Sequence, residues 1–205
     1  MPINPLNSGQ EEAVTSRGCS ILVSAPAGSG KTKIAATVLR YLYDKYSETN
    51  SLNGNIVVVC PPNVEKEWTE EIIDKYKITG VDIISSGVIN TIDDTKHIKH
   101  LLSLKNAKIL LLDEPFGAFD VITRNDMQDW LLQLRKNYNR TTLLVTHDID
   151  EALYLSDRIL ILSNKPSHIL QEIDLSKEKK SRDWLFSQSD LKKQVYELLK
   201  GENHA

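Results

Sequence analysis

Cysteine is nearly absent from this sequence, which has only Cys19 and Cys60 among its 205 residues. Two isolated cysteines do not form the paired spacing of a zinc site, and they do not supply the disulfide framework of a small secreted domain. No apolar run approaches the roughly 18 residues that a membrane-spanning helix needs, and no signal peptide is recognisable. We therefore expect a cytoplasmic chain without a membrane span.

An excess of charge of one sign is also missing. The 25 lysines and arginines nearly balance the 28 aspartates and glutamates, which gives a net charge of −3. Composition alone therefore gives no argument for a nucleic-acid partner or an anionic membrane. Hydrophobic residues make up 40% of the chain and charged residues 26%, and no repeat or low-complexity tract interrupts it. These values are typical of a soluble globular protein, and the length suits one domain.

The most informative stretch is Ala25–Thr32, which reads APAGSGKT. It follows an apolar run and precedes helical spacing, and it fits the P-loop pattern with alanine at the first position. The glycines let backbone N–H groups surround a phosphate chain, and the dipole of the next helix attracts the same charge. Lys31 would reach the β- and γ-phosphates, and the Thr32 hydroxyl would hold Mg²⁺. The predicted phosphate-binding residues are Ala27, Gly28, Ser29, Gly30 and Lys31.

A second informative stretch is the apolar run at 109–112, which is followed directly by Asp113 and Glu114. Ligands of doubly wound sheets bind outside the carboxyl ends of the strands, so the two carboxylates are well placed for chemistry. We expect Asp113 to hold Mg²⁺, directly or through water, and Glu114 to orient or deprotonate an attacking water. Together with Lys31 and Thr32, this pair predicts nucleotide hydrolysis.

Two further polar residues are candidates for the same site. Gln10 precedes the P-loop by about one helix and one strand, and its amide can both accept from and donate to an adenine edge. His147 follows a buried run at 141–146, where a polar side chain can contact the γ-phosphate. The alternatives are an exposed helix glutamine and a structural histidine.

Strand patterns alternate with helix patterns along the whole chain. This order predicts a single P-loop NTPase domain of RecA or ABC-like type, with three α/β/α layers and a mostly parallel central sheet. We expect Gly80 to close one helix and Ile122 to lie on the apolar side of another. The expected strands span residues 20–25, 56–60, 81–85, 109–112, 141–146, 158–162 and 168–174. The expected helices span residues 6–14, 31–46, 65–76, 93–104, 121–137, 150–155 and 189–200.

The motifs of the chain point to two families. The front part carries LNSGQEEAV (6–14), ILVSAPAGSGKT (21–32) and VVVCPPNVEKEWTEEI (57–72). Through these segments, residues 6–87 resemble the first motor domain of superfamily 1 and 2 helicases, in which the third segment touches a nucleic-acid backbone.

The back part carries KILLLDEPFGAFD (108–120) and LLVTHDIDEALYLSDRILILS (143–163). Through these, residues 108–200 resemble the C-terminal half of an ABC-transporter ATPase of the nitrate, sulfonate and taurine import type. This resemblance implies that Asp113 and Glu114 are the Walker B pair, that the region after them is the D-loop, and that His147 is the switch histidine.

Each resemblance also lacks family features. No LSGGQ-like signature lies in residues 91–107, no glutamine lies between Gln10 and Gln128, and no aromatic residue in 1–30 could stack on adenine. A helicase needs a second motor domain, for which 205 residues leave no room. We therefore interpret the chain as a hybrid, helicase-like over about 1–87 and ABC-like over about 108–205, with a seam at about 88–107. An engineered chimera explains this combination better than natural drift.

Four interpretations of function remain open. The first is a monomeric domain that binds Mg·ATP and hydrolyses it slowly, since no arginine finger is recognisable. The second is the ATP-binding subunit of an ABC import transporter, with a membrane permease as its partner. The third is a helicase-type ATPase that depends on single-stranded nucleic acid. The fourth is an engineered folding module with little activity.

Overall fold

The computed structural model describes residues 20–24, 31–48, 55–86, 106–117, 119–137, 140–162 and 169–201. The helices expected at 6–14 and 93–104 lie outside these ranges, as does nearly all of the expected seam. The described strands are β1 (Ser20–Ser24), β2 (Asn55–Cys60), β3 (Val81–Ser85), β4 (Ala107–Asp113), β5 (Thr141–Val145), β6 (Arg158–Leu162) and β7 (Ile169–Asp174). The described helices are α2 (Lys31–Glu48), η1 (Pro62–Val64), α3 (Glu65–Thr69), η2 (Glu70–Lys75), α6 (Val121–Asn137), α7 (Ile149–Leu155), α8 (Arg182–Ser187) and α9 (Ser189–Gly201).

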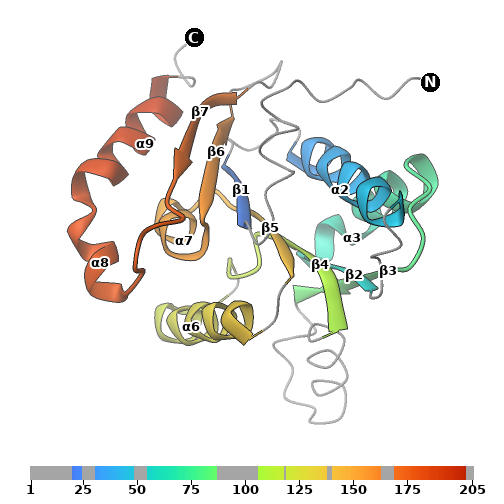
Figure 1. The fold of residues 1–205 in the computed structure, drawn as a ribbon, viewed down its shortest axis with the longest axis horizontal. Helices are drawn as coiled ribbons and strands as arrows, with labels where there is room; N and C mark the ends of the chain where they lie inside the picture. Colours follow the sequence, from blue (N-terminus) through green and yellow to red (C-terminus); the bar gives the residue numbers. More distant parts are fainter. Residues whose placement is uncertain are drawn as a thin grey trace.

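The strands form one sheet in the order β3-β2-β4-β5-β1-β6-β7 (Figure 1). All neighbouring strands from β3 to β6 are parallel, and only β7 runs antiparallel to its neighbour β6. The central strands β2, β4 and β5 consist largely of valine, isoleucine and leucine, as expected where both faces of a parallel sheet are covered. The prediction of a mostly parallel sheet is confirmed.

Two hydrophobic cores lie on opposite faces of this sheet. On one face, alternate residues of β2 such as Ile56 and Val58 pack with α2 and with Trp68 and Ile72 of the following segment. On the other face, the intervening Val57 and Val59 belong to the core that includes α6, α7, α8 and α9. Figure 1 shows the same division, with α2 and α3 away from the C-terminal helices. The three-layer α/β/α prediction is therefore also confirmed.

The helix expected at 65–76 is divided. It begins as the 3-10 turn η1, continues as α3 and ends as the π-helical turn η2. The expectation that Gly80 closes it is wrong, because the chain leaves the helix at Lys77, which has a φ of 53°. Gly80 instead lies directly before β3, with a φ of 71° that glycine adopts without strain. Its carbonyl accepts a hydrogen bond from the Ile56 N–H at 3.1 Å.

The helix expected at 121–137 forms as α6, but its apolar side is shorter than expected. Leu131 and Leu134 are buried, whereas Ile122 is 74% exposed and Val121 is 71% exposed. Asp120 caps this end, since its carboxylate accepts from the N–H groups of Ile122 and Thr123. The first turn therefore lies outside the core, although its residues continue the helical apolar spacing.

The C-terminal helices are tied to the rest by Arg182 of α8, a helix that the sequence patterns did not predict. The guanidinium of Arg182 donates to the side chains of Gln128 at 3.0 Å and Asp129 at 2.8 Å, and to the Asn125 carbonyl at 2.8 Å. It also lies 4.1 Å from the centre of the Tyr154 ring. One side chain thus links α8 to both α6 and α7.

In the part of the chain that the structure describes, no helix combines the length and the apolar character needed to cross a bilayer.

We predict that Arg182→Ala lowers the free energy of unfolding by about 1–3 kcal/mol, because several hydrogen bonds and the ring contact are lost together. Arg182→Lys should recover only part of this, because an ammonium lacks the planar fork that reaches several acceptors. Urea unfolding measures both. Lys179→Ala, at an exposed lysine, is the control and should change stability by less than about 0.5 kcal/mol. An Arg182→Ala variant as stable as the parent would contradict the linking role.

Candidate functional site

The strand register brings three strand ends together at one edge of the sheet. Asp113 at the end of β4 pairs with Val145 at the end of β5, and Val145 pairs in turn with Val23 near the end of β1. Segments that leave these strands therefore begin side by side. Among the described residues they are Glu114 after β4 and Thr146 with His147 after β5, and β1 ends at Ser24, just before the P-loop motif in the sequence. This is the edge at which parallel α/β sheets bind ligands.

The phosphate-binding part of the prediction is described only in its last residues. Helix α2 begins at Lys31, directly after the P-loop, and Thr32 is half-buried in its first turn. Six residues separate this 18-residue helix from the end of β1, and the dipole at its amino end favours an anion. Five further predicted site residues lie outside the described ranges, namely Gln10, Ala27, Gly28, Ser29 and Gly30.

Asp113 is held by a residue that the sequence patterns did not connect with the site. The indole Nε1 of Trp68 donates a hydrogen bond to Oδ2 of Asp113 at 2.8 Å, and both side chains are buried. A hydrogen bond to a carboxylate in a buried setting is charge-assisted and strong. In the sequence, Trp68 has only the spacing of an apolar core residue, so the contact could not be inferred.

Glu114 has an unusual backbone, with a φ of 43°. A non-glycine residue in the left-handed region costs of order 1–3 kcal/mol and persists only where its surroundings enforce it. Here the Glu114 N–H donates to the Val145 carbonyl at 2.8 Å, and the Glu114 carbonyl accepts from Gly117 at 3.3 Å. These bonds fix the turn by which the chain leaves the sheet.

The carboxylate of Glu114 meets His147 at this turn. Nδ1 of His147 lies 3.1 Å from Oε1 of Glu114, although 33 residues separate them in the sequence. The Glu114 side chain is 33% exposed and that of His147 is 68% exposed, so water can reach both. A carboxylate beside an imidazole can orient a water molecule and accept its proton. The structure thus brings together the predicted residues Asp113, Glu114 and His147.

A buried glutamate supports the loop that carries His147. Oγ1 of Thr146 donates to Oε2 of Glu151 at 2.8 Å and accepts from the Asp148 N–H at 3.0 Å. Burial raises the pKa of Glu151 to about 7, although the Thr146 hydrogen bond opposes the shift. Asp148 also caps α7 by accepting from the N–H groups of Asp150 and Glu151. His147 therefore lies between two residues whose side chains are fixed.

The residues at this edge suit Mg²⁺ better than a transition metal. Among the described residues, no group of three His, Cys, Asp or Glu side chains could hold a metal ion. Mg²⁺ needs no such group, because it is usually held by one or two protein oxygens together with phosphate oxygens and water. The Asp113 carboxylate and the Thr32 hydroxyl are donors of this kind. Cys60 is unsuited, since burial first and the charge of Asp113 second raise the pKa of its thiol to about 12.

Comparison with known proteins gives relatives that match more than half of the chain. No family model matches the sequence. The chain is 31% identical over 168 residues to the aliphatic sulfonates import ATP-binding protein SsuB 1 of Pseudomonas savastanoi pv. phaseolicola, and the match covers 72% of this chain and 70% of that protein. The ABC-like part expected at 108–205 is less than half of this chain. Because the match covers 72% of the chain, it also includes residues before 108.

Other relatives match a smaller share. The chain is 38% identical over 113 residues to the nitrate transport protein NasD of Klebsiella oxytoca, which covers 53% of this chain and 41% of NasD. It is also 38% identical to SsuB 2 of Pseudomonas syringae pv. tomato, over 53% of this chain and 47% of that protein. The chain thus spans less than half the length of these two relatives.

The chain is also similar to a solved structure. It is a dimeric post-hydrolysis state of the ATP-binding cassette MJ0796 bound to ADP and Pi. The TM-score is 0.45 at 18% identity, over 78% of this chain and 87% of that chain.

We predict that Glu151 makes the protein less stable as the pH rises. Its pKa is raised from 4.5 to about 7, so the folded state retains a proton that the unfolded state has already lost. Stability from this group is therefore complete below about pH 4.5 and is lost as the pH rises toward 7 and above, by up to about 3 kcal/mol.

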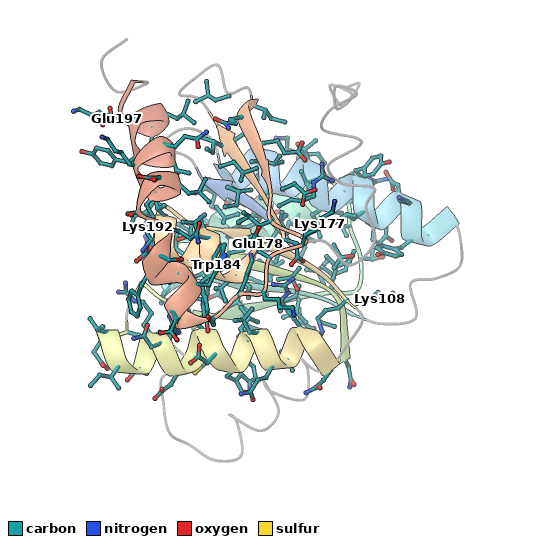
Figure 2. All side chains as sticks on the ribbon, turned by 60° about the vertical axis from the view of Figure 1, so that its left-hand side comes forward. Lys108, Lys177, Glu178, Trp184, Lys192 and Glu197 are labelled. Carbon is teal, nitrogen blue, oxygen red and sulfur yellow. The ribbon has the colours of Figure 1, made fainter. Side chains whose placement is uncertain are left out.

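Glu151→Gln tests this prediction, since the neutral amide can still accept from Thr146. The variant should match the parent near pH 5 and exceed it by about 1–3 kcal/mol at pH 8, measured by urea unfolding at both values. The same substitution at the exposed Glu197 of α9, labelled in Figure 2, is the control and should leave the pH dependence unchanged. Parallel pH profiles for Glu151→Gln and the parent would show that the prediction is wrong.

Proposed function

This chain belongs to the family of ABC-transporter ATPases that includes the sulfonates import protein SsuB 1, and from that premise we propose that it binds Mg·ATP and hydrolyses it slowly. The observation that carries the proposal is the convergence of Asp113, Glu114 and His147 at the sheet edge where the P-loop leaves β1. ATP-binding is also in the name of SsuB 1.

The nucleotide is proposed to bind along the P-loop. The backbone N–H groups of 27–31 and the Lys31 side chain would hold the phosphates, and the start of α2 would add its dipole. Gln10 would read the adenine edge. These assignments rest on the sequence motif, with the position of β1 and α2 as structural support.

Thr32 and Asp113 would hold Mg²⁺. When bound, the ion neutralises the charge of the phosphate oxygens, which is its usual role in phosphoryl transfer. The protein's own contribution is to present two oxygen donors from different elements, α2 and β4. One of these, Asp113, is fixed by the Trp68 hydrogen bond.

Glu114 and His147 are the proposed residues for the water. Glu114 would orient the water that attacks the γ-phosphorus and would accept its proton, so that ATP and water give ADP and phosphate. His147, 3.1 Å from the Glu114 carboxylate, would hold that carboxylate in place and contact the γ-phosphate. No arginine finger is recognisable in the sequence, and such a group is worth about 10³–10⁵ in rate. We therefore infer that a monomer turns over more slowly than about 1 s⁻¹.

A second candidate function is that of an ATP-binding subunit in an import transporter. It is favoured by the names of the relatives, which describe sulfonate import and nitrate transport. This function would require dimerisation and a membrane permease as partner. The chain spans less than half of NasD and SsuB 2, so the activity of a whole transporter protein is a proposal only.

A combination of parts from two families is also a proposal. We keep the interpretation of a single domain that is helicase-like over about 1–87 and ABC-like over about 108–205, with a seam at about 88–107. A nucleic-acid-dependent ATPase would follow if the front part kept its function. The match over 72% of the chain is longer than residues 88–205, so it also includes residues of the front part, where both families have the same P-loop core.

We predict that saturating Mg·ATP raises the melting temperature of the parent and that Lys31→Ala abolishes the shift. A ligand at about 100 times its Kd stabilises the folded state by about 2.7 kcal/mol, which corresponds to about 5–10 °C for a domain of this size. Differential scanning fluorimetry measures the shift. Lys45→Ala, in the last turn of the same helix, should keep it. A parent that melts without any shift would overturn the proposed nucleotide site.

Glu114→Gln should separate binding from hydrolysis. We expect the Mg·ATP melting shift to persist while phosphate release falls by about 10²–10⁴, since the amide cannot accept the proton. Size-exclusion chromatography of the same variant in Mg·ATP then decides between the two candidate functions. An ATP-dependent dimer would support the transporter subunit, and a monomer would support the isolated ATPase. Unchanged phosphate release would refute the role of Glu114.

A further inference from the structure

The hydrogen bond from Trp68 joins two parts of the chain that are 45 residues apart. Trp68 is 0% exposed, and a buried indole N–H normally requires an acceptor. Its acceptor is Oδ2 of Asp113, at 2.8 Å. A backbone carbonyl could also have served as the acceptor of a buried indole. The acceptor is thus the carboxylate that ends β4, at the centre of the proposed site.

The surroundings of Asp113 on this side are dry. Cys60 at the end of β2 is fully buried, and the nearby charge of Asp113 adds to the burial that raises the pKa of its thiol. Charges in such a setting interact strongly, because little water screens them. A donor aimed at one oxygen of Asp113 therefore has a large influence on how this carboxylate is oriented.

The segment that carries Trp68 is also attached to α2. Trp68 and Ile72 share one hydrophobic core with Ala35, Val38 and Leu39 of that helix. At the end of the segment, the Tyr76 hydroxyl lies 2.9 Å from Oγ1 of Thr37, and the Tyr76 carbonyl accepts from Arg40. One rigid connection thus runs from the helix that begins at Lys31 to the carboxylate of Asp113.

We propose that Trp68 is a positioning residue for Mg²⁺. Its N–H occupies Oδ2 and restrains rotation of the Asp113 carboxylate, and its attachment to α2 keeps that carboxylate in a constant relation to the phosphate-binding end of the helix. The inference rests on the proposed function, because it concerns the metal of that same site. Its consequence is specific, since Trp68 should influence metal affinity and not nucleotide affinity.

The test is Trp68→Phe, which keeps an aromatic ring in the core and removes the N–H. The probe is binding of a fluorescent ATP analogue, measured first in EDTA and then over a titration with MgCl₂. We expect the half-saturating Mg²⁺ concentration to rise by about 10–100-fold, the usual effect of losing a partner of a metal ligand. Affinity in EDTA should stay within about 2-fold of the parent.

Trp184 provides a matched control. Its Nε1 also donates to a carboxylate, Oε2 of Glu178, at 2.9 Å, and Figure 2 shows both residues beside each other in the C-terminal part of the chain. Trp184→Phe therefore removes a bond of the same chemical kind, in a more exposed place and away from the proposed site. It should leave the Mg²⁺ dependence unchanged.

A second measurement uses the parent alone and does not depend on the folding of a variant. The chain has three tryptophans, so a ¹⁵N-labelled sample has three indole N–H signals. The signal of Trp68 should be the one protected longest from exchange with deuterated water. It should shift when MgCl₂ is added in the presence of ADP, and the signals of Trp130 and Trp184 should not.

The outcomes separate the inference from the proposed function. If the parent binds nucleotide and Trp68→Phe shows the same Mg²⁺ dependence, or if the protected indole signal ignores the metal, the inference is wrong and the proposed function stands. If the parent binds no nucleotide with or without Mg²⁺, the proposed function is wrong and the inference falls with it. A weaker Mg²⁺ response in Trp68→Phe with intact binding in EDTA supports both.

Discussion

The common direction of the strands is the constraint on which the rest of this structure depends. Because β1, β4 and β5 are parallel and in register at Val23, Asp113 and Val145, every residue that follows them is delivered to one edge. The two cores enforce this register, since a slip of one residue would exchange the face of every side chain in the strand. Hydrophobic packing far from the edge thus sets the relative positions of the polar groups at it.

Much of the fold could be predicted from sequence because its signals are local. Runs such as 56–60 and 141–145 indicate buried strands without reference to any other part of the chain, and Asp113, Glu114 and His147 follow such runs directly. The first turn of α6 was mispredicted for the same reason, since helical spacing describes the helix and not what covers it. Ile122 continues the apolar pattern although most of its side chain is exposed among the described residues.

The parts of the site that were not predicted depend on hydrogen bonds between buried side chains. Sequence spacing and composition do not indicate the hydrogen bond from Trp68 to Asp113 or the one from Thr146 to Glu151. Both form only when the core is assembled. The first of them also joins residues on opposite sides of the proposed seam, a boundary at about 88–107. Residues on either side of that boundary are therefore packed into one structure, whatever the origin of the chain, and fold alone does not decide which role it serves.

The backbone of Glu114 has a consequence for how this sequence can change. At a φ of 43°, glycine would occupy the position without strain, and asparagine would tolerate it better than glutamate does. Any process that rewards stability alone, whether mutation and selection or protein design, should therefore remove glutamate from this turn. A glutamate that is retained here at a cost in stability fits the role in hydrolysis that we propose for its carboxylate.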